Sequence, residues 1–398
     1  MGKKTAKRLW AGAVSLFFLV LSLVALGDLV FPDRISRFTG EKVASRLCFS
    51  CEAEEADETG GPEKGRILAF GILPVKNVTV ASFPKKELIP GGELFGVRME
   101  IRGLMVTGTG KVEGTEISPA ADAGILPGDR IVRADGAEMR GAAAFTRVMA
   151  KSGGKTVTLV LERDDGETEV YLTPVKDPSG VYRAGLWVRE AAAGIGTVTF
   201  RDPETGVIAG LGHGVCDGAT GKIYPLFEGS ICAARPDGVR KATRAQPGEI
   251  RGSLLRGETG VILANTPTGV YAALKDGAAF PEEKAVPVAL RDEVRPGEAT
   301  ILCQLDGEGK RAFTAQIEEI CDREGETKNF VIRVTDRALL DKTGGVIQGM
   351  SGSPVLQNGK LVGAVTHVLL RSPERGYGIF IENMLATAEA VKEGEKAA

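Results

Sequence analysis

Residues 349–354 read G-M-S-G-S-P and lead directly into two short apolar runs. A serine between glycines on a tight turn can bring its hydroxyl and bare backbone N–H groups to the same carbonyl group. Acyl transfer needs that arrangement, with donors about 3 Å from the developing charge. The Asn358-Gly359 pair between the apolar runs predicts a two-residue hairpin turn, which places Ser351 just before a pair of strands. The segment therefore predicts that Ser351 is the nucleophile of a hydrolase.

A serine nucleophile needs a base, and the chain has only two histidines. His213 lies in the segment A-G-L-G-H-G-V-C-D, where glycines on both sides leave the imidazole room to meet a substrate. His367 lies in the returning strand of the predicted hairpin, where a packed histidine is the commoner explanation. We therefore predict His213 as the general base, with His367 as the alternative.

The third catalytic group should be a carboxylate that accepts a hydrogen bond from the imidazole. Asp336 ends the apolar run V-I-R-V-T-D, where a carboxylate can be buried and oriented. Asp217, Asp202 and Asp341 also qualify, although Asp217 on a loop would be solvated. Asp336 is the predicted acid.

The composition favours a mainly β chain with many turns. The sequence has 398 residues, 53 of them glycine, and many short apolar runs are interrupted by Gly, Pro or Asp. This length allows two or three domains. The net charge of −2 gives no electrostatic case for binding nucleic acid.

The N-terminus has the features of an export signal. Four basic residues, Lys3, Lys4, Lys7 and Arg8, precede an uncharged apolar stretch over residues 9–26. That length can span a bilayer with the basic flank on the cytoplasmic side. Ala25-Leu26-Gly27 is also an acceptable cleavage site for a signal peptide. Either alternative exports everything after residue 28, so we predict an extracytoplasmic protein, anchored or secreted.

The cysteines and histidines do not predict a metal site. Cys48 and Cys51 form a lone C-x-x-C, and the other four cysteines are Cys216, Cys232, Cys303 and Cys321. An even count in an exported protein permits disulfides of unknown pairing. A zinc site would need a second such pair or more histidines. We expect neither a metal nor another cofactor.

The chain divides into four predicted segments. Residues 1–28 form the membrane or signal segment, and residues 29–65 a membrane-proximal region that ends in an acidic linker over Glu52–Gly65. Residues 66–178 contain the motif S-P-A-A-D-A-G-I-L-P-G-D-R-I, which resembles a PDZ domain. By that resemblance, Leu94, Phe95, Gly96 and Val97 form the loop that binds a peptide C-terminus. Residues 183–398 carry regular short strands typical of one closed β-barrel or of a double β-barrel.

The order His213, Asp336, Ser351 is that of chymotrypsin-like peptidases, and G-M-S-G-S-P is similar to their G-D-S-G-G-P signature. Four further motifs agree with one family: L-G-H-G, V-I-R-V-T-D, T-G-G-V-I-Q-G-M-S-G-S-P and G-A-V-T-H-V. Together they resemble the stage IV B sporulation serine peptidases of endospore-forming bacteria. The resemblance covers most of the chain and implies a triad of His213, Asp336 and Ser351.

The chymotrypsin-like resemblance also implies further site residues. The oxyanion hole would be formed by the amides of Gly349 and Ser351, and residues Ala364, Val365, Thr366 and His367 would pair with the substrate backbone. Met350 replaces the aspartate that pairs with a new N-terminus in trypsin-like zymogens, so that route of activation is absent.

The family resemblance implies a role in signalling. Such a peptidase is exported into the space between the two forespore membranes, cleaves itself in trans and cuts a membrane-bound regulator. The cut releases an intramembrane protease, which activates a late mother-cell sigma factor. The PDZ domain would recognise self and partner. Two alternatives stay open: a catalytically silent PDZ scaffold, and a quality-control protease, against which the PDZ-first order counts.

Overall fold

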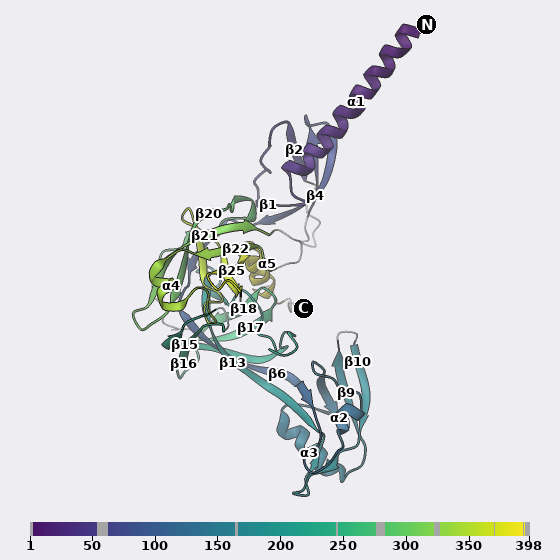
Figure 1. The fold of residues 1–398 in the computed structure, drawn as a ribbon, viewed down its shortest axis with the longest axis vertical. Helices are drawn as coiled ribbons and strands as arrows, with labels where there is room; N and C mark the ends of the chain where they lie inside the picture. The colour runs from purple at the N-terminus through teal and green to yellow at the C-terminus, as the bar shows by residue number, and fades with distance from the viewer. Residues whose placement is uncertain are drawn as a thin grey trace. The chain divides into compact units, whose positions relative to one another are not determined.

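The computed structural model describes residues 3–53, 63–163, 166–243, 246–275, 283–321, 327–369, 371–392 and 394. The chain is mainly β and splits into two compact units (Figure 1). The first comprises Met1–Glu87 with Pro287–Val294, and the second most of the remaining chain. Each unit is described separately below.

The first unit is a long helix followed by a small sheet. Helix α1 spans Lys3–Val30, and its segment Trp10–Val30 is long and apolar enough to cross a membrane. The sheet has the order β1-β4-β3-β2, with β1 parallel to β4. Its strands are β1 (Arg34–Phe38), β2 (Phe49–Ala53), β3 (Glu63–Ala69) and β4 (Leu73–Phe83), and the short helix η1 (Arg291–Glu293) belongs to the same unit.

The two ends of the predicted acidic linker lie in strands of this sheet. The two strands are antiparallel neighbours, because Glu52 of β2 faces Arg66 and Ala53 faces Gly65 of β3. Residues 54–62 lie outside the described part of the chain. The segment therefore connects two strands of one sheet and does not separate two domains.

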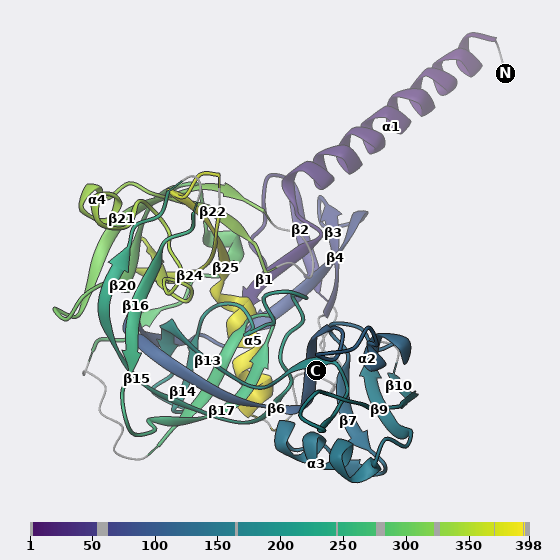
Figure 2. The same cartoon turned by 60° about the horizontal axis from the view of Figure 1, so that its bottom comes forward.

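The second unit contains a PDZ body inserted into a β-barrel. Strand β6 (Leu94–Thr109) leaves the barrel and enters the PDZ body, and β13 (Leu186–Arg201) returns beside it (Figures 1 and 2). Leu104, Ile131, Leu159 and Leu172 form part of the PDZ core. The elements between the two long strands are α2 (Pro119–Asp122), β7 (Arg130–Ala134), β8 (Ala137–Glu138), α3 (Ala142–Ser152), β9 (Val157–Arg163), β10 (Gly166–Leu172), β11 (Val175–Lys176) and β12 (Tyr182–Arg183).

The first barrel closes through β6 and β13. Its strands follow the order β6-β15-β17-β18-β14-β13, and the pairing of β13 with β6 completes the ring. Phe95, Val97 and Val198 lie in its core. The remaining strands are β14 (Val207–Gly210), β15 (Leu226–Arg240), β17 (Gly260–Thr266) and β18 (Gly269–Leu274), with β16 (Glu249–Leu254) paired to β15; β5 (Glu87–Pro90) and β19 (Val286–Pro287) lie beside the ring in the strand order.

The second barrel is closed in the order β20-β21-β22-β25-β24-β23. Its strands are β20 (Gly297–Gln304), β21 (Lys310–Ile320), β22 (Phe330–Val334), β23 (Pro354–Gln357), β24 (Lys360–Val368) and β25 (Arg375–Phe380). Helix α4 (Arg337–Thr343) follows β22, and α5 (Ile381–Lys392) follows β25. The two barrels confirm the predicted mainly β, double-barrel fold.

The domain order differs from the one expected from sequence. We expected a PDZ domain over residues 66–178 and a peptidase from 183 onward. Residues 94–101 of β6 instead belong to the first barrel, where they pair with both β13 and β15. The PDZ body is therefore an insertion between two adjacent strands of the barrel, and it is not a module placed before the peptidase.

Candidate active site

The loop that carries Ser351 is shaped by two glycines. Gly349 and Gly352 both adopt φ +95°, a conformation that side-chain-bearing residues rarely adopt. Gly352 also lies so close to β13 that a Cβ there would come within 2.0 Å of the Thr197 carbonyl oxygen. The G-x-S-G pattern is thus required by backbone geometry at both ends of the turn.

Both barrels hold this loop. Thr197 and Thr199 of β13 donate their hydroxyls to the carbonyls of Gly349 and Gly352, at 2.7 and 2.8 Å. On the other side, the Gly352 amide donates to the Val365 carbonyl of β24 at 2.7 Å. Sequence reasoning missed the two threonines. Their signal is the T-x-T spacing in the second half of β13, which places both hydroxyls on one face of the strand.

The amides around Ser351 alternate between engaged and open. Met350, Gly352 and Ser353 each donate a backbone hydrogen bond within the loop or to β24. Among the described residues, no acceptor takes the amides of Gly349 and Ser351. These are the two amides predicted to form the oxyanion hole, and they are available to a substrate carbonyl.

The Ser351 hydroxyl is bonded to the backbone of β24. Its Oγ donates to the Thr366 carbonyl oxygen at 2.6 Å. No hydrogen bond joins it to either histidine in the described part of the chain. The nucleophile is therefore held by a main-chain acceptor.

His213 lies on the turn that follows β14. Leu211 and Gly212 both have positive φ, at 67° and 66°, so the chain reverses sharply just before the imidazole. The Nδ1 atom lies 2.9 Å from the Gly214 carbonyl oxygen, to which it donates, and this tautomer leaves Nε2 free to accept a proton. Burial lowers the pKa of His213 below its ordinary 6.5, against the opposing effect of the bond to Gly214.

The second histidine is next to the first. The rings of His213 and His367 lie 4.9 Å apart between centroids, at an interplanar angle of 38°. Partial burial lowers the pKa of His367 to about 4, with further contributions from the charge of His213 and of Lys328. Both rings are therefore neutral near pH 7. The sequence predicted that His367 lies in the hairpin, but no motif indicated its contact with His213.

Asp336 caps a helix in the structure. It is the N-cap residue of α4, where one carboxylate oxygen accepts from the Leu339 amide at 3.0 Å. The other accepts a long bond of 3.5 Å from the Thr314 amide. Within the described residues it makes no hydrogen bond to His213.

The alternative carboxylates have other partners as well. Asp217 is buried and accepts from the Tyr224 hydroxyl at 3.0 Å and from the hydroxyl and amide of Thr220. Asp202 accepts from the amides that follow it in its own turn, and Asp341 is exposed. Over the described residues, none of these carboxylates contacts His213.

The predicted substrate strand is open at one end only. Ala364 is paired with Pro354 of β23 and Ile379 of β25, and the Val365 amide donates to the Ser353 carbonyl. The register shifts between Val365 and Val368, so Thr366 and His367 fall outside the regular ladder. Ala364 and Val365 are therefore already paired within the barrel, Thr366 is buried, and His367 is exposed.

The residues predicted to form the PDZ peptide loop lie elsewhere. Leu94, Phe95, Gly96 and Val97 are buried in β6 and paired with β13 and β15 of the barrel. Gly96 is needed there because a Cβ would come within 2.4 Å of Leu254 and 2.7 Å of the Cys232 sulfur. A peptide terminus has no access to these amides.

The PDZ body has a groove in another place. It lies between α3 and the first residues of β13, has a volume of about 320 Å³, and is lined by Phe145, Thr146, Met149, Leu186, Trp187 and Val188 among others. In this region β13 pairs with β6 on one side, and its other edge has no strand partner among the described residues. The amides of Ala184 and Gly185, at the end of the groove, have no acceptor in the described chain.

The described residues contain no cluster suited to a metal ion. No group of three or more His, Cys, Asp or Glu side chains is arranged to hold a metal there. No disulfide joins cysteines within the described part of the chain.

Two family models match the chain. SpoIVB peptidase S55 matches residues 180–385, just over half of the 398 residues, and a PDZ domain model matches residues 113–163. Among curated relatives, a Mesorhizobium japonicum protein that carries the name zinc metalloprotease is 38% identical over 96 residues, which is 24% of this chain and 26% of that protein. The chain thus spans about a quarter of this relative.

Solved structures of two proteases are also similar. The HtrA-type protease AlgW with a tripeptide has a TM-score of 0.31 and 14% identity over 51% of this chain and 57% of its own. The Rv3671c protease of Mycobacterium tuberculosis, in its active form, has a TM-score of 0.30 and 17% identity over 52% of this chain and 75% of its own.

Proposed function

Since the chain belongs to the SpoIVB peptidase S55 family, we propose that it is an exported serine endopeptidase with Ser351 as its nucleophile. The observation that carries the proposal is the pair of unengaged amides, at Gly349 and Ser351, on a loop that both barrels hold in place. Such preorganised donors stabilise the charge that develops on a carbonyl oxygen in acyl transfer.

The reaction begins with a change of partner at Ser351. Its hydroxyl leaves the Thr366 carbonyl and donates to Nε2 of His213, which takes the proton as Oγ attacks the scissile carbonyl carbon. The amides of Gly349 and Ser351 bind the oxyanion. His213 then protonates the leaving amine, and an acyl-enzyme remains. Water attacks the acyl-enzyme and gives a proton to His213, which passes it to Ser351 Oγ as the ester bond breaks and the acid product leaves.

The Thr366 carbonyl links this change to substrate binding. Thr366 is buried, and its carbonyl, which holds the resting serine, lies where β24 shifts register. A substrate backbone N–H that bonds to this carbonyl would compete with the serine hydroxyl. Substrate binding would therefore free the nucleophile. In this proposal Asp336 is the acid of the triad, as the family resemblance implies, and reaches His213 only after rearrangement from its cap on α4.

The proposed substrates are proteins. By the same resemblance, the chain cuts itself in trans and a membrane-bound regulator of an intramembrane protease, in the space between two membranes of a spore-forming cell. We place peptide recognition in the groove between α3 and β13, where a segment can add to the free edge of β13 and the amides of Ala184 and Gly185 can bind a carboxylate.

Replacement of the nucleophile tests the enzymatic part of the proposal. Ser351→Ala should lower peptide turnover by roughly a millionfold and abolish labelling by a fluorophosphonate probe, because the catalytic groups act as a unit. Ser353→Ala is the matched control, since it removes a serine two positions away in the same loop and should keep the label. Mass spectrometry of the labelled peptide identifies the residue.

The alternative is a silent scaffold that only tethers partners through the PDZ body. It predicts no label at Ser351 and full function in Ser351→Ala. If the purified Ser351→Ala protein still cuts itself or its substrate, Ser351 is not the nucleophile and the proposal fails.

A further inference from the structure

The N-terminal helix contributes to a folded core. The side chains of Leu23, Val24 and Leu26, in the last turns of α1, pack against the hydrophobic cluster of the small sheet. Gly27 lies so close to that sheet that a Cβ would come within 3.1 Å of Val75 and 3.8 Å of Phe49. The end of α1 is therefore an integral part of the first unit, whereas Trp10 and Leu16 are exposed.

This packing determines what cleavage at the predicted signal-peptide site, residues 25–27, would cost the first unit. A cut there would remove Leu23 and Val24 from the core of the sheet. It would also disrupt the close packing of Gly27 against Val75. Deleting several partly buried apolar side chains that pack on a small core costs it part of its stability. The packing therefore favours a helix that stays attached as an anchor.

One end of the same sheet carries exposed apolar side chains. Leu47, Phe70 and Ile72 have exposed fractions of 79%, 67% and 83%. Phe70 and Gly71 form the tight turn between β3 and β4, with φ of 53° and 72°. Leu47 lies beside this turn, because the next residue, Cys48, accepts a hydrogen bond from the Phe70 amide at 2.7 Å. We name these three residues the apolar tip.

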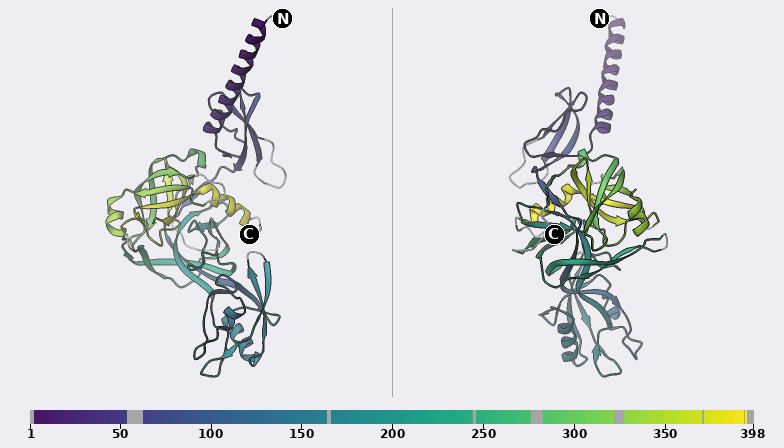
Figure 3. Two further views of the ribbon diagram at one scale, coloured as in Figure 1. Left: turned by 45° about the vertical axis from the view of Figure 1, so that its right-hand side comes forward. Right: turned by 90° about the vertical axis from the view of Figure 1, so that its left-hand side faces the viewer.

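The apolar tip lies on the side of the sheet that runs along α1. Strand β1, which follows the end of the helix, pairs with the far end of β4 at Thr79, whereas Leu73 beside the tip packs on the same cluster as Leu23. Two views show the sheet rising beside the lower part of α1 (Figure 3). The tip is thus level with a part of the helix that is apolar enough to lie in a membrane.

We propose that the apolar tip inserts into the lipid bilayer beside α1, so that the chain is held at the membrane by an uncleaved helix and by a second contact. Exposed apolar side chains on a soluble domain mark an interaction surface, and Phe at a turn beside a spanning helix suits the boundary between headgroups and acyl chains. The partner is lipid, because the tip continues the apolar surface of the helix.

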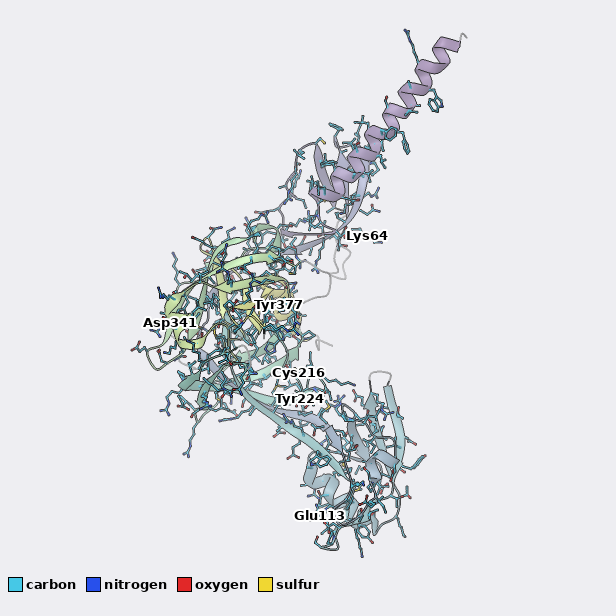
Figure 4. The ribbon with its side chains drawn as sticks, in the orientation of Figure 1. Lys64, Glu113, Cys216, Tyr224, Asp341 and Tyr377 are labelled. Atoms are coloured by element: carbon cyan, nitrogen blue, oxygen red, sulfur yellow. The ribbon has the colours of Figure 1, made fainter. Side chains whose placement is uncertain are left out.

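Single-tryptophan fluorescence tests the insertion in the full chain. Trp10 and Trp187, the only two tryptophans, are replaced by Phe, and Ser351→Ala prevents self-cleavage, so that the outcome does not depend on the proposed catalysis. Phe70→Trp then reports from the tip. Lys64→Trp is the matched control, because Lys64 is exposed at the opposite end of the same strand (Figure 4). The proteins are reconstituted into phosphatidylcholine–phosphatidylglycerol vesicles with lipids brominated near the glycerol backbone.

We expect Phe70→Trp to lose most of its emission and Lys64→Trp to lose little. Ile72→Trp provides a second tip position and should behave as Phe70→Trp does. Equal quenching at both ends of β3, or none at the tip, overturns the insertion. Mass spectrometry of the membrane-bound chain should find residues 1–27 retained, and loss of the segment before residue 25 or 27 overturns the anchor.

Discussion

At the scale of single residues, each predicted catalytic group has a partner outside the triad. Ser351 is bonded to the Thr366 carbonyl, the Nδ1 of His213 to the Gly214 carbonyl, and Asp336 to the amides of Leu339 and Thr314. By contrast, the amides of Gly349 and Ser351, which we propose as the oxyanion hole, have no acceptor among the described residues. If the proposed mechanism holds, the described arrangement is a resting one in which the oxyanion donors are placed before the proton-transfer groups meet.

The pH dependence of activity should reflect the burial of His213. A general base must be neutral, so activity rises as pH increases through the pKa of His213. Because burial lowers that pKa below 6.5, the acidic limb of kcat/KM should have its midpoint below 6.5. A pH profile of peptide hydrolysis measures this midpoint. A midpoint above 6.5 would contradict His213, in the environment described, as the general base.

Removal of His367 is the control for that profile. The pKa of His367 is about 4, so it is neutral throughout the range in which His213 titrates. His367→Gln should therefore leave the midpoint of the acidic limb in place.

Asp336 can be tested separately as an acid and as a helix cap. Asn is as good an N-cap as Asp, so Asp336→Asn should keep the thermal stability, while Asp336→Ala should lose about 1 kcal/mol. If Asp336 is the acid of the triad, Asp336→Asn should still lower kcat by roughly ten-thousandfold, because the amide cannot orient the imidazole in the same way. An Asp336→Asn protein of full activity and full stability would assign the residue to the cap alone.

At the scale of elements, the nucleophile loop depends on β13 and β24. Strand β13 of the first barrel supplies two hydroxyl donors. Strand β24 of the second barrel supplies the carbonyls of Val365 and Thr366. Neither barrel alone would hold the loop in its shape. The site therefore requires that both barrels be folded and docked.

Removal of the Thr199 hydroxyl and removal of the Ser353 hydroxyl should have different effects on the free energy of unfolding. The Thr199 hydroxyl is buried and donates to the Gly352 carbonyl, so Thr199→Val should reduce the free energy of unfolding by about 1–3 kcal/mol. The Ser353 hydroxyl is buried without a partner among the described residues, so Ser353→Ala should leave stability unchanged or raise it by about 1 kcal/mol. Urea unfolding of both variants compares them, and a destabilised Ser353→Ala would contradict the assignment of an unpaired hydroxyl.

The sequence predicted the parts of the site that depend on local geometry. The glycines around Ser351 and His213 are there because the backbone adopts positive φ or approaches another strand closely, and such glycines are visible in a pattern. The hydroxyls of Thr197 and Thr199 that hold the loop come from more than a hundred positions away, and nothing near Ser351 in the sequence indicates them. Gly96 shows the opposite error, since it looked like a loop glycine but makes room for Leu254 and Cys232.

At the scale of the whole chain, the first barrel needs residues from both sides of the PDZ body. A chain that begins at residue 183 lacks residues 94–101, which pair with β13 and β15. It should therefore fail to form the first barrel, and limited proteolysis should degrade it quickly. A chain in which residues 104–188 are replaced by a short turn keeps both barrel segments and should resist proteolysis.

These two variants distinguish a PDZ domain placed before the peptidase from a PDZ body inserted into its first barrel. If the shorter chain, starting at 183, folds and hydrolyses peptides, the barrel does not require β6. If the chain without the PDZ body hydrolyses short peptides but no longer recognises a protein substrate, recognition and chemistry are separable. The alternation of strands and turns predicted the barrels, but insertion into a strand pair leaves no mark in local sequence, because each half of β6 looks like an ordinary short strand.

The shared strands also limit how this architecture can change over generations. A binding module at the end of a chain can be gained, lost or exchanged through one recombination event at one junction. Here β6 and β13 each continue from one body into the other, so an exchange needs two junctions at once, each in register with its neighbour. The PDZ body and the barrels are therefore expected to be inherited together.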